Sequence, residues 1–175
     1  MIDWRRILTD WAGKFPVHEG GPAHPAVYHM LDVAAVAEVL VQQSETTHAQ
    51  GQALVLLIAL HDLGKIGNAF RNMLNSGTAQ GKAHWEVSEA LLRHHDGLLM
   101  PVFGGDQQVR HELYAAIAGH HGKPPPSDRH QILRTAHMAG HEARTDAGAV
   151  IELFISLWPE EHRGHRGVAA RNDLG

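Results

Sequence analysis

The sequence predicts an all-α fold, and three observations support this prediction. The most apolar run of the chain, residues 53–60, is typical of a buried helix. Apolar residues recur at helical spacing along residues 25–43, which indicates a second long helix. No segment alternates apolar and polar residues in the way that indicates a half-buried strand. We therefore expect helices joined by loops, and no sheet.

Length and composition are compatible with one domain. The chain has 175 residues, of which 43% are hydrophobic and 6% aromatic, so it is long enough to bury a substantial core. We expect the folded domain to cover residues 1–160. Residues 161–175 are polar and lack helical periodicity, and we interpret them as a tail or as the start of a further C-terminal segment.

The composition also excludes several classes of protein. The absence of cysteine excludes disulfides, zinc–thiolate sites and a cysteine nucleophile. The N-terminus lacks the apolar run of a signal peptide, and no run reaches the roughly 18 apolar residues of a membrane span. We expect a cytoplasmic protein with no membrane partner. The formal net charge of −4 does not indicate a nucleic-acid binder, so contact with a polyanion would have to be local.

The N-terminal part of the chain predicts a short helix over residues 3–12 and a loop over residues 13–24. Pro25 suits the first turn of the long helix, which we expect to end near residue 43. Positions on one stripe of a helix share a face, and the stripe that we expect to face the core consists of His29, Val33, Val36 and Leu40.

A polar connection over residues 44–51 leads to the apolar helix, which we expect to end at Asp62. Gly64 is interpreted as the residue that lets the chain turn. Asn68 is the expected N-cap of a short helix that ends at residue 74, and residues 77–82 form a further loop.

The second half of the chain predicts four more helices. Residues 83–94 predict a helix with His84 at its start, and Gly97 with residues 101–105 predicts a loop. Asp106 is a suitable N-cap for a helix that ends at residue 119.

The last two helices have their own boundary signals. Ser127 or Asp128 is expected to cap a helix to residue 139. Asp146 is expected to open the final helix, and Pro159 to end it.

His61 and Asp62 are the first indication of a metal site. They end the most apolar run of the sequence, and burying an imidazole or a carboxylate without a partner costs several kcal/mol. A metal ion is the strongest partner available to such a pair. The chain contains 16 histidines and no cysteine, so any metal must bind to histidine and carboxylate ligands.

A two-metal centre is the chemistry that such residues allow. The carboxylate of Asp62 can bridge two ions, with His61 on one and His120 or His121 on the other. Two ions about 3.5–4 Å apart activate a bridging water and bind the attacking and leaving oxygens of a phosphodiester. Lys65 follows closely and could bind a nonbridging phosphate oxygen. A lone core histidine such as His29 is more often a structural residue, so its role as a ligand requires others nearby.

Four sequence motifs together resemble a known family. They are residues 24–32 with His24, His29 and Asp32, residues 61–65 followed by Ala69-Phe70, His84 before Ser88, and Gly119-His120-His121-Gly122. In this order they resemble the HD superfamily of metal-dependent phosphohydrolases. Within it they are most similar to the HD nuclease domain of the CRISPR-associated helicase-nuclease of type I systems. The resemblance runs from residue 24 to about residue 123 and, more weakly, over residues 154–158.

This resemblance implies the helical HD fold and two metal positions. It implies that His29, His61 and Asp62 hold one ion, and the ligands that it implies for the other ion are Asp62, His84, His120 and His121. The catalytic residues are then Asp62 and Lys65. The implied cofactors are two divalent ions, manganese, iron, nickel or cobalt, with magnesium as a further candidate. The implied substrate is single-stranded DNA, and the implied partners are a CRISPR surveillance complex and a helicase.

The sequence departs from this family in two respects. The family's last metal-binding aspartate lies in an Ala-Asp-Trp-like motif on a late helix, which this chain lacks. Asp146 comes too early and Asp173 lies in the polar segment, so neither replaces it. The chain also lacks the Gly-x-x-x-x-Gly-Lys-[Ser/Thr] phosphate loop of a helicase. A nucleotide phosphohydrolase of the same fold and a catalytically inactive interaction module therefore remain as alternatives.

Overall fold

The computed structural model describes residues 2–16, 18, 21–77, 79, 81–122 and 128–158. Two short 3-10 helices, η1 (Leu60–Lys65) and η2 (Gly119–His121), continue α3 and α7. The expectation of an all-α fold is confirmed. The α-helices of the described residues are α1 (Trp4–Asp10), α2 (Ala26–Gln42), α3 (His48–Ala59), α4 (Asn68–Ser76), α5 (His84–His94), α6 (Asp96–Phe103), α7 (Gln107–Ala118), α8 (Arg129–Met138) and α9 (His141–Leu157).

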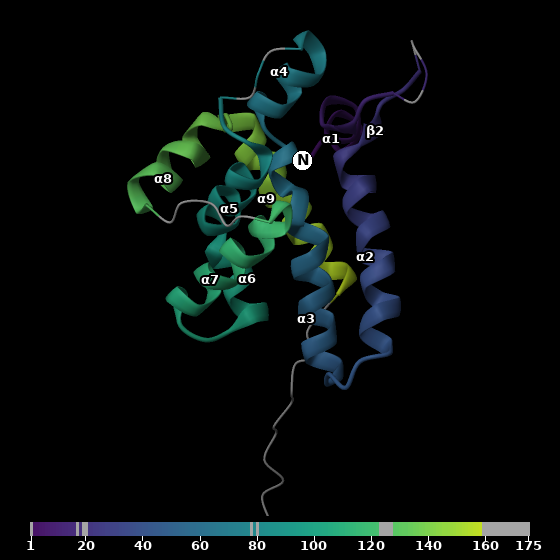
Figure 1. The fold of residues 1–175 in the computed structure, drawn as a ribbon, viewed down its shortest axis with the longest axis vertical. Helices are drawn as coiled ribbons and strands as arrows, with labels where there is room; N and C mark the ends of the chain where they lie inside the picture. Colours follow the sequence, from purple (N-terminus) through teal and green to yellow (C-terminus); the bar gives the residue numbers. More distant parts are fainter. Residues whose placement is uncertain are drawn as a thin grey trace, which may run out of the picture.

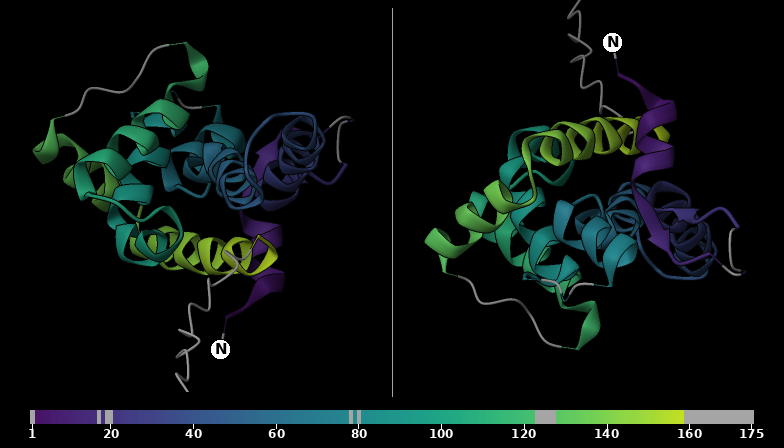
Figure 2. Two further views of the ribbon diagram at one scale, coloured as in Figure 1. Left: turned by 90° about the horizontal axis from the view of Figure 1, so that it is seen from below. Right: turned by 90° about the horizontal axis from the view of Figure 1, so that it is seen from above.

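The helices form two groups around η1. Helices α2 and α3 lie side by side, and α5 packs against α7 and α8 in a second group (Figure 1). Helix α9 runs behind both groups, with α1 beside it (Figure 2). The short η1 contacts α2, α3, α5 and α7, so it lies where the two groups meet. All six residues of η1 are buried.

The expectation that the chain has no strand is wrong in one place. Strands β1 (Ala12–Lys14) and β2 (His24–Pro25) pair antiparallel, and the Ala26 backbone N–H donates to the Trp11 carbonyl beside them at 2.8 Å. Strands of two or three residues are too short to show an alternating pattern, which explains why the sequence did not indicate them.

Residues 101–105 were expected to be a loop together with Gly97, but α6 covers most of this segment. Pro101 lies inside α6 and lacks a backbone N–H to donate. The helix is stabilised by tertiary contacts instead, because Leu99 is fully buried and Asp96 in its first turn pairs with Arg110 on α7. Local propensity therefore favoured the wrong structure.

The stripe expected to bury the long helix is also wrong. Val36 and Leu40 are 60% and 63% exposed, and α2 buries a neighbouring face. That face consists of Ala26, Val27, Met30, Ala34 and Ala37. Its alanines are small enough for α3 to approach closely. Helix α2 carries apolar residues on its exposed side as well, so the sequence pattern did not distinguish the buried face from the exposed face.

Several helix boundaries differ from expectation. Helix α3 begins at His48, after a capping box between Thr47 and Gln50, where a polar connection was expected. The N-cap of α4 is Gly67, and Asn68 is its first residue, with its side chain accepting a hydrogen bond from Arg71. The capping box that begins α3 is a local side-chain contact that the periodicity does not reveal, and α4 has no side-chain cap.

The last helix begins at His141, before the expected Asp146. Asp146 lies inside α9 and is 2% exposed. Its carboxylate pairs with Arg6 and accepts a hydrogen bond of 2.7 Å from the Trp11 indole N–H. These contacts attach the N-terminal segment to α9, and they explain why an acidic residue is tolerated in the middle of a buried helix.

Other expected boundaries are confirmed. The side chain of Asp106 accepts from the Gln108 backbone N–H, and that of Asp128 from the His130 backbone N–H, so both are N-caps. Ser127, Pro159 and the segment 161–175 lie outside the described residues. Among the described residues no single helix is long and apolar enough to cross a membrane. The bent pair formed by residues 48–65 and 68–76 meets that criterion jointly, by length and composition only.

Candidate metal centre

The centre is built on η1, which lies directly against the start of α5. A Cβ atom at Gly64 would collide with the carbonyl oxygen of His84 and the backbone nitrogen of Ser88. The Gly64 backbone N–H also donates to the Ser88 hydroxyl at 2.8 Å. Gly64 was expected to provide a turn, but its role is this close approach. The contact brings His84 next to Asp62.

One carboxylate oxygen of Asp62 is surrounded by three nitrogens. Oδ2 lies 2.8 Å from His29 Nε2, 3.1 Å from His61 Nε2 and 2.7 Å from Lys65 Nζ. Asp62 is 3% exposed and Lys65 8% exposed, so these contacts are shielded from water. His29 on α2 and the η1 residues therefore form one group of possible metal ligands, His29, His61 and Asp62.

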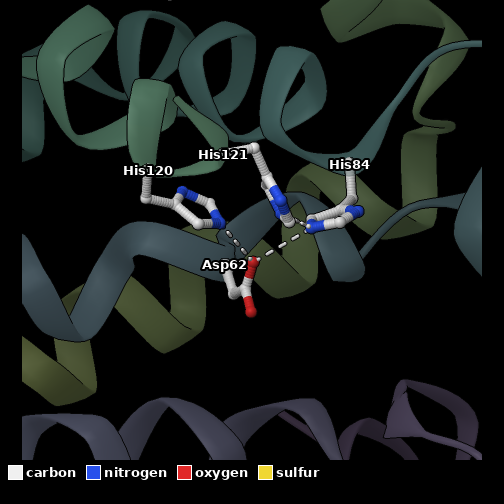
Figure 3. A group of neighbouring side chains, drawn as sticks. All are labelled: Asp62, His84, His120 and His121. Atoms are coloured by element: carbon white, nitrogen blue, oxygen red, sulfur yellow. Dashed lines mark hydrogen bonds and ion pairs between the residues drawn. The ribbon is translucent and has the colours of Figure 1, made fainter. Parts of the chain in front are cut away.

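The other oxygen of Asp62 faces a second group of histidines (Figure 3). Oδ1 lies 3.3 Å from His84 Nε2 and 3.4 Å from His120 Nε2, and His121 Nε2 lies 3.0 Å from His84 Nε2. One ligand atom from each of these four residues lies within 4.8 Å of the others. The group joins η1, the first residue of α5 and η2.

Backbone contacts determine which nitrogen of two rings carries the proton. His61 Nδ1 lies 2.9 Å from the Ile58 carbonyl, and His120 Nδ1 lies 3.0 Å from the Ile117 carbonyl. A carbonyl only accepts, so Nδ1 carries the proton in both rings, and in the neutral imidazole Nε2 carries a lone pair. Both lone pairs point at the Asp62 carboxylate.

The pKa values of these groups favour metal binding. Burial would raise the pKa of Asp62, but the hydrogen bond from His29 opposes this effect, and the pKa of Asp62 is held well below its usual range. Burial lowers the pKa of His120 and of His121. The carboxylate is therefore charged and these two imidazoles stay neutral to lower pH, which are the protonation states that bind metal ions.

The donor atoms fit divalent transition-metal ions. Asp62 Oδ1 is buried and has no hydrogen-bond partner among the described residues. Imidazole lone pairs next to an unpaired carboxylate oxygen repel it unless a cation lies between them. Imidazole and carboxylate ligands suit manganese, iron, nickel and cobalt.

The structure thus brings together the six residues named as metal ligands from the sequence. Trp85 lies next to these ligands and is half-buried, with the centre of its ring 4.6 Å from the centre of the His121 ring. Asp146 binds Arg6 and Trp11 and is not part of either ligand group. Asp173 lies outside the described residues.

Helix α5 carries a buried ion pair that the sequence does not indicate. Glu89 is 1% exposed and pairs with Arg93 one turn later. Burial raises the pKa of Glu89, although Arg93 opposes this. An acidic and a basic residue at i, i+4 normally indicate a solvated helix face, so no signal in the sequence distinguishes this buried pair.

Three comparisons with known proteins give the same result. A family model described as the HD domain of Cas3 matches residues 11–171. The CRISPR-associated endonuclease/helicase Cas3 of Thermus thermophilus is 29% identical over 159 residues, covering 71% of this chain and 16% of that protein. The chain is also similar to a crystal structure of the Thermus thermophilus Cas3 HD domain in the presence of Ni²⁺. The TM-score is 0.61 at 24% identity, and the match covers 86% of this chain and 64% of the other.

Proposed function

Because the chain belongs to the family of Cas3 HD domains, we propose that it is a metal-dependent nuclease that hydrolyses single-stranded DNA in CRISPR interference. One observation carries the proposal. The charged carboxylate of Asp62 lies between two groups of histidines, and its oxygen Oδ1 is buried without a hydrogen-bond partner among the described residues. This arrangement supplies histidine and carboxylate ligands of the kind that a metal-dependent phosphodiester hydrolase requires.

Asp62 is the central residue of the proposed reaction. The two ligand groups share only this residue, so Asp62 would help to hold both ions. When bound, such ions supply a deprotonated water as the nucleophile and neutralise the charge on the phosphodiester. His29 and His61 are shielded from solvent, whereas His120 and His121 are exposed. The exposed pair marks the side from which a DNA strand reaches the centre.

Lys65 was expected to bind a nonbridging phosphate oxygen, and this role stays a prediction. Its ammonium contacts Asp62 Oδ2 at 2.7 Å and lies 5.6 Å from the centre of the Phe70 ring. These contacts support a positioning role, in which Lys65 orients the carboxylate rather than touching the substrate.

The proposed partners follow from the relatives. The chain spans 16% of the length of the endonuclease/helicase that it matches, so most of that protein has no counterpart in the matched segment. We propose that a helicase subunit or domain delivers the single-stranded DNA and that a surveillance complex recruits both. The centre itself holds the groups for hydrolysis and none of the phosphate-loop residues for ATP binding.

The test uses the purified chain with circular single-stranded DNA, in the presence of Mn²⁺ or of a chelator. We expect nicking with Mn²⁺, none with chelator and none with Asp62→Ala. Asp32→Ala is the matched control, because Asp32 is exposed, hydrogen-bonds to His24 and is outside both ligand groups. Double-stranded circles and RNA assayed in parallel test the preference for single-stranded DNA.

Two results would contradict the proposal. Absence of cleavage with manganese, nickel, cobalt and iron, in protein that binds these ions, would favour the inactive interaction module. Hydrolysis of mononucleotides instead of DNA would favour the nucleotide phosphohydrolase.

A further inference from the structure

The two oxygens of Asp62 have different surroundings. Oδ2 has three nitrogens within 3.1 Å, and one of them is the Lys65 ammonium, which is a cation and can only donate. Oδ1 is buried and has no hydrogen-bond partner among the described residues. His84 Nε2 and His120 Nε2 lie 3.3 Å and 3.4 Å from Oδ1 and are themselves possible ligands. A cation that approaches Oδ1 therefore meets imidazoles that can bind it, whereas a cation that approaches Oδ2 has to share this oxygen with Lys65.

The two ligand groups also differ in the number of ligand atoms that they offer. The Oδ1 side offers four ligand atoms, from Asp62, His84, His120 and His121. The Oδ2 side offers three, from His29, His61 and Asp62. Among the described residues no further carboxylate completes the second group, and Asp146 is engaged by Arg6 and Trp11.

Lys65 cannot move away from Oδ2 without losing other contacts. It is 8% exposed, and its ammonium lies 5.6 Å from the centre of the Phe70 ring as well as on Asp62. An ion on His29 and His61 would contact the same oxygen as this ammonium, so two positive charges would lie close together in a poorly hydrated place. Such like-charge repulsion is weakly screened.

We propose that Lys65 makes the two metal positions unequal. A divalent transition-metal ion binds first at Asp62, His84, His120 and His121, and the position at His29 and His61 binds a second ion much more weakly because Lys65 shares its carboxylate oxygen. The inference rests on the proposed function only in that both require ions at Asp62. Lys65 is then a positioning residue that limits metal occupancy.

The first experiment measures ion stoichiometry without any nucleic acid. Metal-stripped protein is titrated with Co²⁺ and with Mn²⁺ by calorimetry, and its ion content is determined after desalting. We expect one retained ion per chain and a second dissociation constant at least tenfold higher than the first. Two ions of equal affinity would overturn the inference.

Substitutions at Lys65 test the cause of the inequality. Lys65→Met removes the charge and keeps the length of the side chain, so we expect the second ion to bind at least tenfold more tightly. Lys82→Met is the matched control, because Lys82 pairs with Glu86 and is outside both ligand groups, and it should leave both affinities unchanged. Unchanged second-ion affinity in folded Lys65→Met would overturn the inference.

Two further variants test which of the two positions binds the tightly held ion, and they do not depend on the folding of Lys65→Met. His29→Ala should keep the tightly bound ion and its Co²⁺ absorption spectrum, whereas His121→Ala should weaken that ion at least tenfold. The reverse order would overturn the inference.

The DNA assay separates this inference from the proposed function. Unequal ion binding without DNA cleavage would contradict the function alone, and cleavage with two equal ions would contradict the inference alone.

Discussion

Asp62 and Asp96 are both buried carboxylates, but the protein surrounds them in opposite ways. Both oxygens of Asp96 are satisfied, because Arg110 donates from Nε to Oδ1 at 2.8 Å and from Nη2 to Oδ2 at 2.7 Å, and the Tyr114 hydroxyl donates to Oδ1 at 2.9 Å. Around Asp62, Oδ1 has no hydrogen-bond partner among the described residues, and two imidazole lone pairs point at the carboxylate.

This difference separates a structural carboxylate from a ligand. The Arg110 guanidinium neutralises the carboxylate and donates a hydrogen bond to each of its oxygens, so Asp96 requires no metal ion from solution. Asp62 is surrounded partly by groups that cannot donate, so its full stabilisation requires a cation. Completeness of the hydrogen bonds, more than burial, therefore indicates which acidic residue is functional.

The largest expected difference between the two residues is in catalysis. Asp62→Asn should lower metal-dependent DNA cleavage at least ~10³-fold, about 4 kcal/mol of activation free energy, because it removes the charge that both ligand groups share. Asp96→Asn should leave the rate within about threefold. Initial rates on circular single-stranded DNA at low temperature measure both, and equal losses would contradict the distinction.

In the absence of metal, Asp96→Asn should lower the stability of the fold more than Asp62→Asn does. Asp96→Asn should lower the free energy of unfolding by about 3 kcal/mol, because it leaves the buried guanidinium of Arg110 without its anion. Asp62→Asn should cost less than half of that, because an amide oxygen still accepts from Lys65 and no longer repels lone pairs. Urea denaturation in the presence of chelator measures the two values, and a larger loss for Asp62→Asn would be the contrary result.

Added metal ions should raise the free energy of unfolding only in proteins that retain Asp62. At an ion concentration of 100 times the dissociation constant, the wild type should gain about 2.7 kcal/mol in unfolding free energy. Asp96→Asn should show the same gain from its lower starting point, and Asp62→Asn should show almost none. Thermal denaturation with and without Mn²⁺ tests this, and a gain retained in Asp62→Asn would place the ions elsewhere.

The pH dependence of stability sharpens the contrast. Hydrogen bonds from Arg110 lower the pKa of Asp96 to about 2, compared with an ordinary value of about 3.9. A lowered pKa stabilises the fold fully above the ordinary value, and this contribution is lost as the pH falls through about 2. The stability difference between wild type and Asp96→Asn should therefore shrink by about 2 kcal/mol between pH 6 and pH 2. A difference independent of pH would contradict the ion pair.

The smallest expected effect is at Tyr114. Its hydroxyl makes one of the hydrogen bonds to Asp96, so Tyr114→Phe should cost about 1 kcal/mol. The ring stays in place, and burial together with Asp96 raises the pKa of its hydroxyl, so loss of that titration in an alkaline absorbance scan identifies the residue. A cost above about 3 kcal/mol would mean that Tyr114 contributes mainly through packing.

The comparison also explains what could be predicted from the sequence. The possible metal ligands were predictable because they lie in short motifs at helix ends, where His61, Asp62, His120 and His121 are adjacent in pairs. The pairing of Asp96 with Arg110 was not, because the two residues lie on different helices and the helix that carries Asp96 contains Pro101. The contact of Lys65 with Asp62 depends on the packing of η1, which no local pattern encodes.

The packing of Gly64 against α5 has a consequence for folding. The ligands of the centre come from α2, η1, α5 and η2, and they meet only when these segments are assembled around η1. A partly folded chain lacks the complete ligand set, so hydrolysis cannot begin before the domain is finished. A newly made polypeptide therefore lacks the assembled ligand set, and metal binding would report the completion of its fold.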